Sequence, residues 1–280
     1  MKKSSLLALP AAALLLATFT FCSEAALRLF DVAARQETTL SQALPELQTL
    51  RILHVGELHD RPGHHRAQLE IIRALHDSAT PVLVGLEMFE QRNQDALDAW
   101  VSRSLSEEEF LPHFRSNWGE SWPLYRDIFD YCRSQGIPMV GLNVPRAIVS
   151  QVAREGFESL TEEQVGQLPP VSCNVAPEYM ELLRSSYGHH GSDQSFVNFC
   201  EAQVVWDTAM AYYALERLEK HPRAVMVVLA GAIHAWRPGI PTRVQIQAPG
   251  TPQRVILPET REIDRDSVSL QDCDYLFFPR

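Results

Sequence analysis

Two short apolar segments near opposite ends of the chain finish in the same pattern, Gly-x-x-His. The first segment is Ile52–His59 and the second is Val227–His234. Each is typical of a buried strand followed by a tight turn, where glycine lets the backbone approach its neighbours closely. In open α/β sheets, ligands bind outside the carboxyl ends of the strands. The two segments therefore predict an α/β fold in which both imidazoles lie at one edge of a sheet.

The chain between these segments alternates apolar strands with helical stretches, which predicts a mainly parallel central sheet with helices on both faces. Residues 105–135 are rich in tryptophan and proline and predict a helical cap insertion. Residues 160–194 predict short helices and a loop that cover the site. The predicted strands are 51–55, 81–86, 137–142 and 224–230, and the predicted core helices are 62–78, 91–101, 146–156 and 195–220.

The two flanks of this pattern carry weaker signals. Residues 26–50 predict an amphipathic leader, and the charged residues after 257 predict a loosely attached tail. Residues 242–247 and 253–256 predict two short edge strands, for which antiparallel pairing is one option. We expect a single domain over residues 26–280, with a core at about 40–257.

The composition excludes one class of partner. The chain has 280 residues, of which 21% are charged, and its net charge is −10. Phosphate recognition requires clustered lysine and arginine, and the sequence shows no basic stripe. We therefore expect no nucleic-acid partner.

The N-terminus predicts export. Lys2 and Lys3 precede an apolar run over 6–21, and small residues follow at 23–25, so residues 1–25 are predicted to be a signal peptide. An apolar run of about 16 residues is short for a membrane span. The expected location is the periplasm or cell envelope. Cys22 leaves a lipid anchor open, and membrane contact is expected only through such an anchor or a transporter.

Four cysteines remain after residue 25, with no Cys-x-x-Cys pair among them. They are Cys132, Cys173, Cys200 and Cys273. In an oxidising compartment they predict either two disulfides or buried thiols.

Polar side chains follow each predicted strand. Glu57 and His59 follow the first, Glu87 the second and His234 the last. A carboxylate at the end of a buried strand requires a partner. One interpretation is a hydrogen-bonded cluster that closes the sheet edge. The other is catalytic: His59 and His234 would bind a divalent metal ion together with Glu57 or Glu87, and the remaining glutamate would act as the base of a hydrolase.

Supporting residues are expected around this group. Asn143 and Arg146 follow the third strand, while Gln203 and Asp207 lie on the long helix, and such groups commonly orient imidazoles. No Gly-x-Ser-x-Gly motif is present, which argues against a serine esterase.

Two further groups are candidates for haem binding. Tyr187, His189 and His190 lie in a glycine-flanked loop, and tyrosine and histidine both serve as axial ligands of haem iron. His64 and His65 open the first helix and could point toward the strand-end cleft. The alternatives are a solvated histidine pair and an exposed histidine-rich loop.

Several motifs in order resemble the ChaN family of haem-binding uptake proteins, over roughly residues 40–257. This family belongs to a superfamily with Tiki-type proteases and erythromycin-esterase-like proteins. The matching motifs are Gly56-Glu57-x-His59-Asp60, Gly85-Leu86-Glu87-Met88-Phe89, Asn143-x-Pro145-Arg146, Ala202-Gln203-x-x-Trp206-Asp207, Gly231-x-x-His234 and Gly239-Ile240-Pro241-x-Arg243.

The resemblance implies an α/β fold, a cell-envelope location and haem held cofacially between two subunits, hence a homodimer. It also implies that Glu57, His59, Glu87 and His234 match the superfamily site. Two functions follow as hypotheses: a haem-binding protein of iron uptake, or a metal-dependent hydrolase that uses the strand-end residues.

Overall fold

The computed structural model describes residues 26–279, apart from 172–174, 188–191 and 262. Within this part of the chain, eight strands form one sheet in the order β2-β1-β8-β7-β3-β6-β4-β5. The predicted α/β class with a mainly parallel sheet is confirmed. The bounds of the parallel strands are β3 Ile52–Glu57, β4 Val82–Glu90, β5 Met139–Asn143, β6 Val225–Gly231, β7 Gln253–Pro258 and β8 Tyr275–Phe277.

The two strands that carry the Gly-x-x-His segments are direct neighbours. β3 and β6 pair in parallel, with Gly56 opposite Ala230 and Glu57 opposite Gly231. All residues of both strands are buried, as expected for a parallel strand that is covered on both faces. β4 pairs with the other side of β6, so Glu87 reaches the same edge of the sheet.

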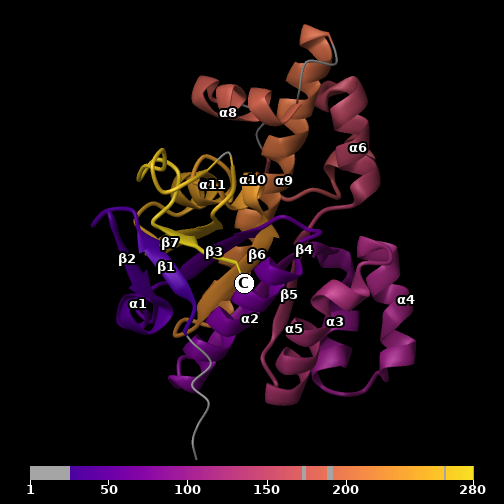
Figure 1. Ribbon diagram of the computed structural model, residues 1–280. Helices are drawn as coiled ribbons and strands as arrows, with labels where there is room; N and C mark the ends of the chain where they lie inside the picture. The colour runs from indigo at the N-terminus through magenta and orange to yellow at the C-terminus, as the bar shows by residue number, and fades with distance from the viewer. Residues whose placement is uncertain (1–25, 172–174, 188–191, 262, 280) are drawn as a thin grey trace, which may run out of the picture.

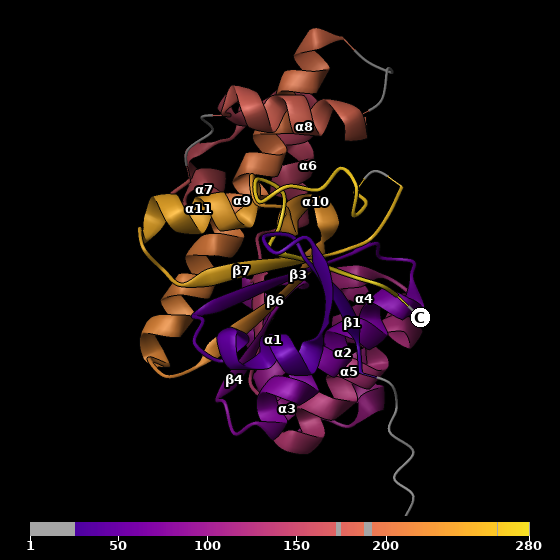
Figure 2. The same ribbon diagram turned by 60° about the vertical axis from the view of Figure 1, so that its left-hand side comes forward.

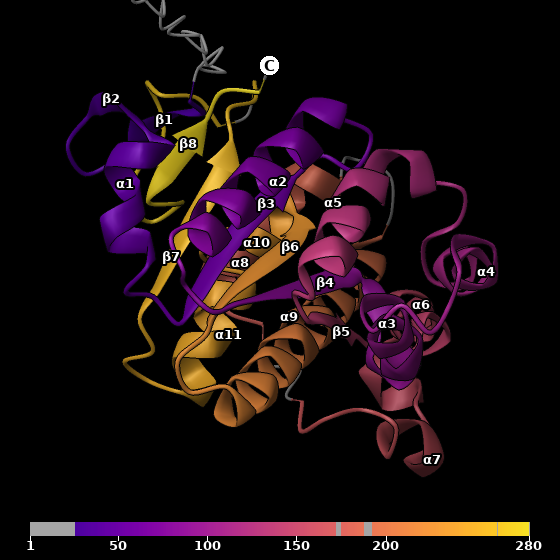
Figure 3. The same cartoon turned by 90° about the horizontal axis from the view of Figure 1, so that it is seen from below.

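Helices cover both faces of this sheet, as the view from below shows (Figure 3). One face packs against α1 (Leu40–Leu47), α2 (Pro62–Asp77), α3 (Gln94–Val101), α4 (Glu107–Trp118) and α5 (Trp122–Gln135). The other face packs against α9 (Asp193–Lys220) and α11 (Ile240–Gln247). The predicted helical insertion at 105–135 thus forms α4 and α5, whose fully buried Phe110 and Phe114 belong to the core of the first face.

A second helical layer rises beyond the carboxyl ends of the strands (Figures 1 and 2). It contains α6 (Arg146–Glu155) and α8 (Pro177–Tyr187), which pack on α9, and the short α7 (Glu162–Val165). The short helices predicted within 160–194 are therefore present.

Several predictions for the flanks are wrong. Residues 242–247 lie in helix α11, because Pro241 starts a helical turn and Ile240 and Val244 bury its inner side. The strand predicted at 253–256 is present as β7, but it lies between β3 and β8, parallel to both, and is therefore neither antiparallel nor at the edge of the sheet.

The leader and the tail are also integral parts of the sheet. The hairpin of β1 (Arg28–Asp31) and β2 (Gln36–Thr39) pairs with β8, whose Leu276 and Phe277 are fully buried. The tail is therefore not loosely attached, because pairing with distant strands holds segments that look weak on their own.

The cysteines with a described position are buried free thiols: Cys132, Cys200 and Cys273. Two disulfides are therefore not formed, and Cys173 lies outside the described residues. No helix in the described part of the chain is long and apolar enough to cross a membrane. The predicted signal peptide and the anchor at Cys22 fall within residues 1–25, outside the described residues, and stay predictions.

Candidate functional site

A cavity of about 410 Å³ opens at the carboxyl edge of the sheet and brings together five of the predicted site residues. These are His59, Glu87, Asn143, Arg146 and His234. The full lining is His59, Glu87, Met88, Glu90, Asn117, Trp118, Ser121, Asn143, Val144, Arg146, Trp206 and His234.

Glu57 is the centre of the first half of the site. Its carboxylate is buried at the end of β3 and accepts hydrogen bonds from His59 Nδ1 at 2.7 Å, from Gln68 Nε2 at 2.8 Å and from the Tyr125 hydroxyl. His65 Nε2 lies 3.3 Å from its Oε2 atom. Burial alone would raise the pKa of Glu57, but the hydrogen bonds from His59 and His65 outweigh it and lower the pKa to about 2.

His59 stands between this carboxylate and the cavity. Its side chain is 45% exposed, and its ring packs edge-on against Trp118 at 5.1 Å. Burial opposes a charge on the imidazole, but the bond to Glu57 and the charge of Glu87 raise the pKa of His59. A Cβ atom at Gly231 would lie 3.0 Å from His59 Nε2, so the glycine of the second Gly-x-x-His segment makes room for the histidine of the first.

His234 forms the second half of the site on the same plan. Its Nδ1 donates to Asp207 Oδ1 at 2.7 Å, and the Tyr179 hydroxyl donates to the other oxygen of Asp207. Its Nε2 lies 3.7 Å from Glu87 Oε1. Burial opposes protonation, but the charges of Glu87 and Asp207 raise the pKa of His234 to about 9.

Glu87 lies between the two imidazoles. The structure extends β4 to Glu90, so Glu87 lies within the strand and not after it, at a shift of register against β5. Its carboxylate accepts the Gly231 N–H at 2.6 Å, and Asn143 Nδ2 donates to its backbone carbonyl at 2.8 Å. Each imidazole is thus held at Nδ1 by a buried carboxylate and keeps Nε2 on the side of Glu87.

Two tyrosines that the sequence motifs did not indicate hold the carboxylates of Glu57 and Asp207. Tyr125 lies on α5 and Tyr179 on α8, and both are buried. A tyrosine on an apolar helix face is expected to be buried, and its hydroxyl then requires a hydrogen-bond partner. This is the signal by which the sequence could have indicated both residues.

The arrangement gives no support to the predicted metal ion. Among the residues that the structure describes, no group of three or more histidine, cysteine, aspartate or glutamate side chains is placed to hold a metal. Both Nδ1 atoms of the imidazoles are already used by carboxylates.

Other predicted site residues lie away from the cavity. His64 Nδ1 accepts the Leu58 N–H at 2.8 Å, its ring packs edge-on against Phe277, and burial lowers the pKa of His64 to about 4. His65 packs against Tyr125 behind Glu57. Gln203 is buried on α9, and its Oε1 atom has no hydrogen-bond partner among the described residues.

An open hollow of about 500 Å³ adjoins the cavity and shares His59 with it. Leu58, Ala232 and Ile233 form its apolar part, and Leu58 is 39% exposed. Ile233 also packs against the side-chain cluster between α8 and α9 that contains Tyr187. Ile233 therefore lines the hollow and also borders the cluster on which Tyr187 packs.

Tyr187 is the accessible tyrosine of α8. It is half-buried, and its ring packs against Phe196 and Phe199 at 5.4 and 5.1 Å. Tyr179 of the same helix is 1% exposed and bonded to Asp207. His189 and His190 lie outside the described residues.

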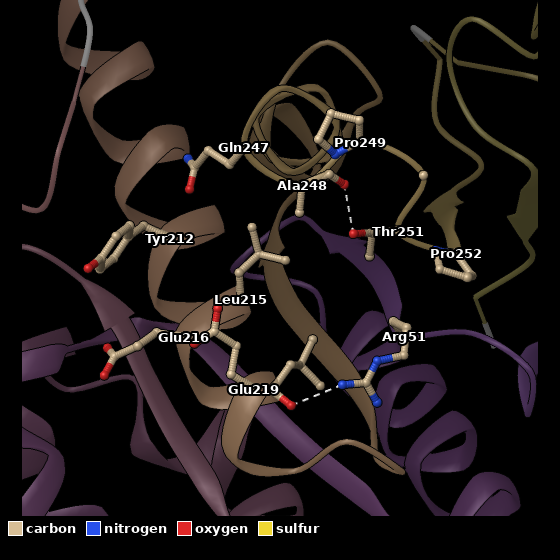
Figure 4. A pocket seen from close by; sticks show the side chains of 12 residues that line it. Arg51, Tyr212, Leu215, Glu216, Glu219, Gln247, Ala248, Pro249, Thr251 and Pro252 are labelled. Atoms are coloured by element: carbon tan, nitrogen blue, oxygen red, sulfur yellow. Dashed lines mark hydrogen bonds between the residues drawn. The ribbon is translucent and has the colours of Figure 1, made fainter.

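A further cavity of about 540 Å³ lies far from these residues, at the amino end of β3 (Figure 4). Arg51 lines it, but this guanidinium donates to Leu218 O in the last turn of α9 at 3.0 Å and to Ala224 O, just before β6, at 2.6 Å. These bonds satisfy the end of the helix, so Arg51 has a structural role.

Comparisons with known proteins identify the family and match the fold. The family model described as "Haem-binding uptake, Tiki superfamily, ChaN" matches residues 43–244, well over half of the chain. A solved structure, "Cofacial heme binding to ChaN of Campylobacter jejuni", superposes with a TM-score of 0.72 at 19% identity, over 92% of this chain and 98% of that one. The type III effector HopBA1 superposes with a TM-score of 0.52 at 12% identity, over 86% of this chain and 93% of that one.

One curated relative is a much longer protein than this chain. Protein RETICULATA-RELATED 5, chloroplastic, from Arabidopsis thaliana is 25% identical over 255 residues, which cover 83% of this chain. The match spans only 34% of that protein.

Proposed function

The chain belongs to the ChaN family of haem-binding uptake proteins in the Tiki superfamily, and on that premise we propose that it binds haem at the open hollow beside Leu58 and Ile233. The observation that carries the proposal is the position of Ile233, which lines the apolar hollow and also packs against the side-chain cluster on which Tyr187 packs. A flat apolar ring gains stability by leaving water for such a surface.

The shape of the hollow favours a complex of two copies. It is open, so it covers one face of a flat ring and leaves the other face to a partner. A second copy of the chain would cover that face, and the structural neighbour, ChaN of Campylobacter jejuni, binds haem cofacially. We therefore propose a homodimer in the haem-bound state.

The proposed iron ligands are Tyr187 together with His189 or His190. Tyrosine and histidine both ligate haem iron. Tyr187 is partly accessible, whereas His64 and His65 are 4% and 3% exposed and hold the loop after β3. We assign these last two a positioning role.

We also propose a location for the protein in the cell. Residues 1–25 would act as a signal peptide and deliver the protein to the periplasm or cell envelope, where it would take part in haem uptake. The metal-dependent hydrolase is the less supported alternative, because the described residues contain no metal-binding group.

A hemin titration of the purified protein tests the proposal. We expect a saturable shift of the Soret band and a change from monomer to dimer in gel filtration. Tyr187→Phe should change the spectrum and weaken binding, since it removes the phenolate oxygen and leaves the ring packing. Tyr212→Phe, on the opposite side of the molecule, is the matched control.

Two results would count against the proposal. A flat titration of the wild-type protein would remove haem as the ligand. If Glu57→Gln abolished binding while Tyr187→Phe and His189→Ala did not, the ligand assignment would be wrong.

A further inference from the structure

The apolar hollow and the polar cavity meet at His59, which lines both. The hollow offers no free hydrogen-bond donor from a side chain, since its other polar residues, Glu57 and Asp60, are acidic. The polar cavity, in contrast, is lined by side-chain donors such as Arg146 and Ser121. A ligand with an apolar body and a polar edge would therefore be drawn into both compartments in one orientation.

Several hydrogen-bond donors in the lining of the polar cavity have no acceptor among the described residues. The guanidinium of Arg146 and the hydroxyl of Ser121 make no hydrogen bond or ion pair with the residues that the structure describes. Trp206, also in the lining, has a buried indole N–H without an acceptor in the same part of the chain. The unpaired indole N–H of Trp206 is buried at a cost in free energy, and the exposed guanidinium of Arg146 has no counter-charge, so the cavity favours a ligand that brings acceptors.

The acidic residues in the lining already have partners. Glu87 accepts the Gly231 N–H, and Glu90 accepts Arg92 Nε at 2.5 Å and the backbone N–H of Arg146 at 2.9 Å. His59 is likewise paired with Glu57 through Nδ1. The positive charge of Arg146 is thus left at the rim for an added anion.

Building on the proposed function, we infer that the polar cavity receives the carboxylate side chains of the porphyrin and that Arg146 selects them. Arginine matches a carboxylate with two parallel N–H groups, which provides orientation as well as attraction. The ring then lies over the apolar hollow with its acidic edge turned toward α6. A porphyrin whose carboxylates are blocked loses this preference.

The test compares hemin with its dimethyl ester, each titrated into the purified protein and followed at the Soret band. Because Arg146 is exposed and partly screened, we expect the wild-type protein to prefer hemin by about tenfold. Arg146→Gln should remove most of this preference, and Arg146→Lys should keep part of it. Arg154→Gln is the matched control, because it removes the same charge from an exposed position of the same helix outside the cavity.

The outcomes separate this inference from the function on which it rests. If the wild-type protein binds both porphyrins equally well, or if Arg146→Gln keeps the full preference, the inference is overturned and haem binding stands. If Arg154→Gln loses the preference to the same extent, general charge attraction explains it and the assignment to Arg146 is overturned. If neither porphyrin binds to the wild-type protein, the proposed function fails, and this inference fails with it.

Discussion

His54 gives β3, the strand that carries the first half of the site, a defined sensitivity to acid. Its side chain is fully buried, and its Nε2 donates to Gln253 Oε1 at 2.9 Å. Its Nδ1 atom has no partner among the described residues. Burial lowers the pKa of His54 from 6.5 to about 4, and the charge of Arg237 acts in the same direction, while the bond to Gln253 opposes it.

The direction of the effect follows from linkage. The unfolded chain binds a proton at His54 below pH 6.5, whereas the folded protein does so only near pH 4. The contribution of the neutral His54 side chain to the free energy of unfolding is therefore present above pH 6.5 and is lost as the pH falls toward 4. Between about pH 7 and about pH 4.5 the loss corresponds to about 2.5 kcal/mol of unfolding free energy.

Urea denaturation of the wild-type protein and of His54→Gln at these two pH values measures the loss. Glutamine keeps a donor toward Gln253 but does not titrate. We expect the wild-type protein to lose about 2.5 kcal/mol more than the variant on acidification. Other groups, such as His64, titrate in both proteins and cancel in the difference. His113→Gln, at an exposed position, should behave like the wild type.

A constant difference between wild type and His54→Gln at both pH values would refute the reasoning. It would mean that water or a nearby anion reaches His54 in the folded protein, so that the buried imidazole is not kept neutral.

Three further predictions concern the site. Gly231→Ala should weaken hemin binding severalfold with a small loss of stability, because a Cβ atom would lie 3.0 Å from His59 Nε2 and displace that ring; unchanged binding would show that the position of His59 does not matter. Tyr125→Phe should lower the unfolding free energy by about 1–3 kcal/mol in chemical denaturation, because it removes a donor from the buried carboxylate of Glu57. The raised pKa of His234 stabilises the fold below pH 6.5, and this contribution of at most about 3 kcal/mol is lost as the pH rises toward 9, so the stability of His234→Gln should vary less over that interval.

The strands and helices of the central fold were predictable because their signals are local. A run such as Val225–Gly231 is apolar throughout, and Pro62 marks the start of a helix in the first turn. The same local signals failed for residues 242–247, where an alternation typical of a strand lies in a helix. Short segments of this kind take the structure that their neighbours in space allow.

The edges of the sheet were not predictable for a related reason. β8 has only three residues, and it is held by β7 on one side and by β1 on the other. β1 lies at the opposite end of the sequence from β8. Pairing over such a distance leaves no mark in either segment alone.

The sequence likewise indicated some residues of the candidate site and not others. The repeated Gly-x-x-His pattern and the acidic residues near it identified Glu57, His59, Glu87 and His234 as one group, and the cavity brings three of them together with Glu57 directly behind His59. The pattern could not show that Tyr125 and Tyr179 hold the two buried carboxylates, because each tyrosine comes from a helix far away in the chain.

By itself, the sequence determined the class of the fold, the adjacency of ligand-type residues at the strand ends and the family. These features follow from hydrophobic periodicity and from short motifs, which act over a few residues. Only the tertiary structure decided which partner each imidazole takes, that His59 lines both an apolar hollow and a polar cavity, and that the guanidinium of Arg146 is left without a partner among the described residues. The physical reason is that burial, hydrogen bonding and charge pairing depend on distances between segments that only the packed sheet and its helices bring together.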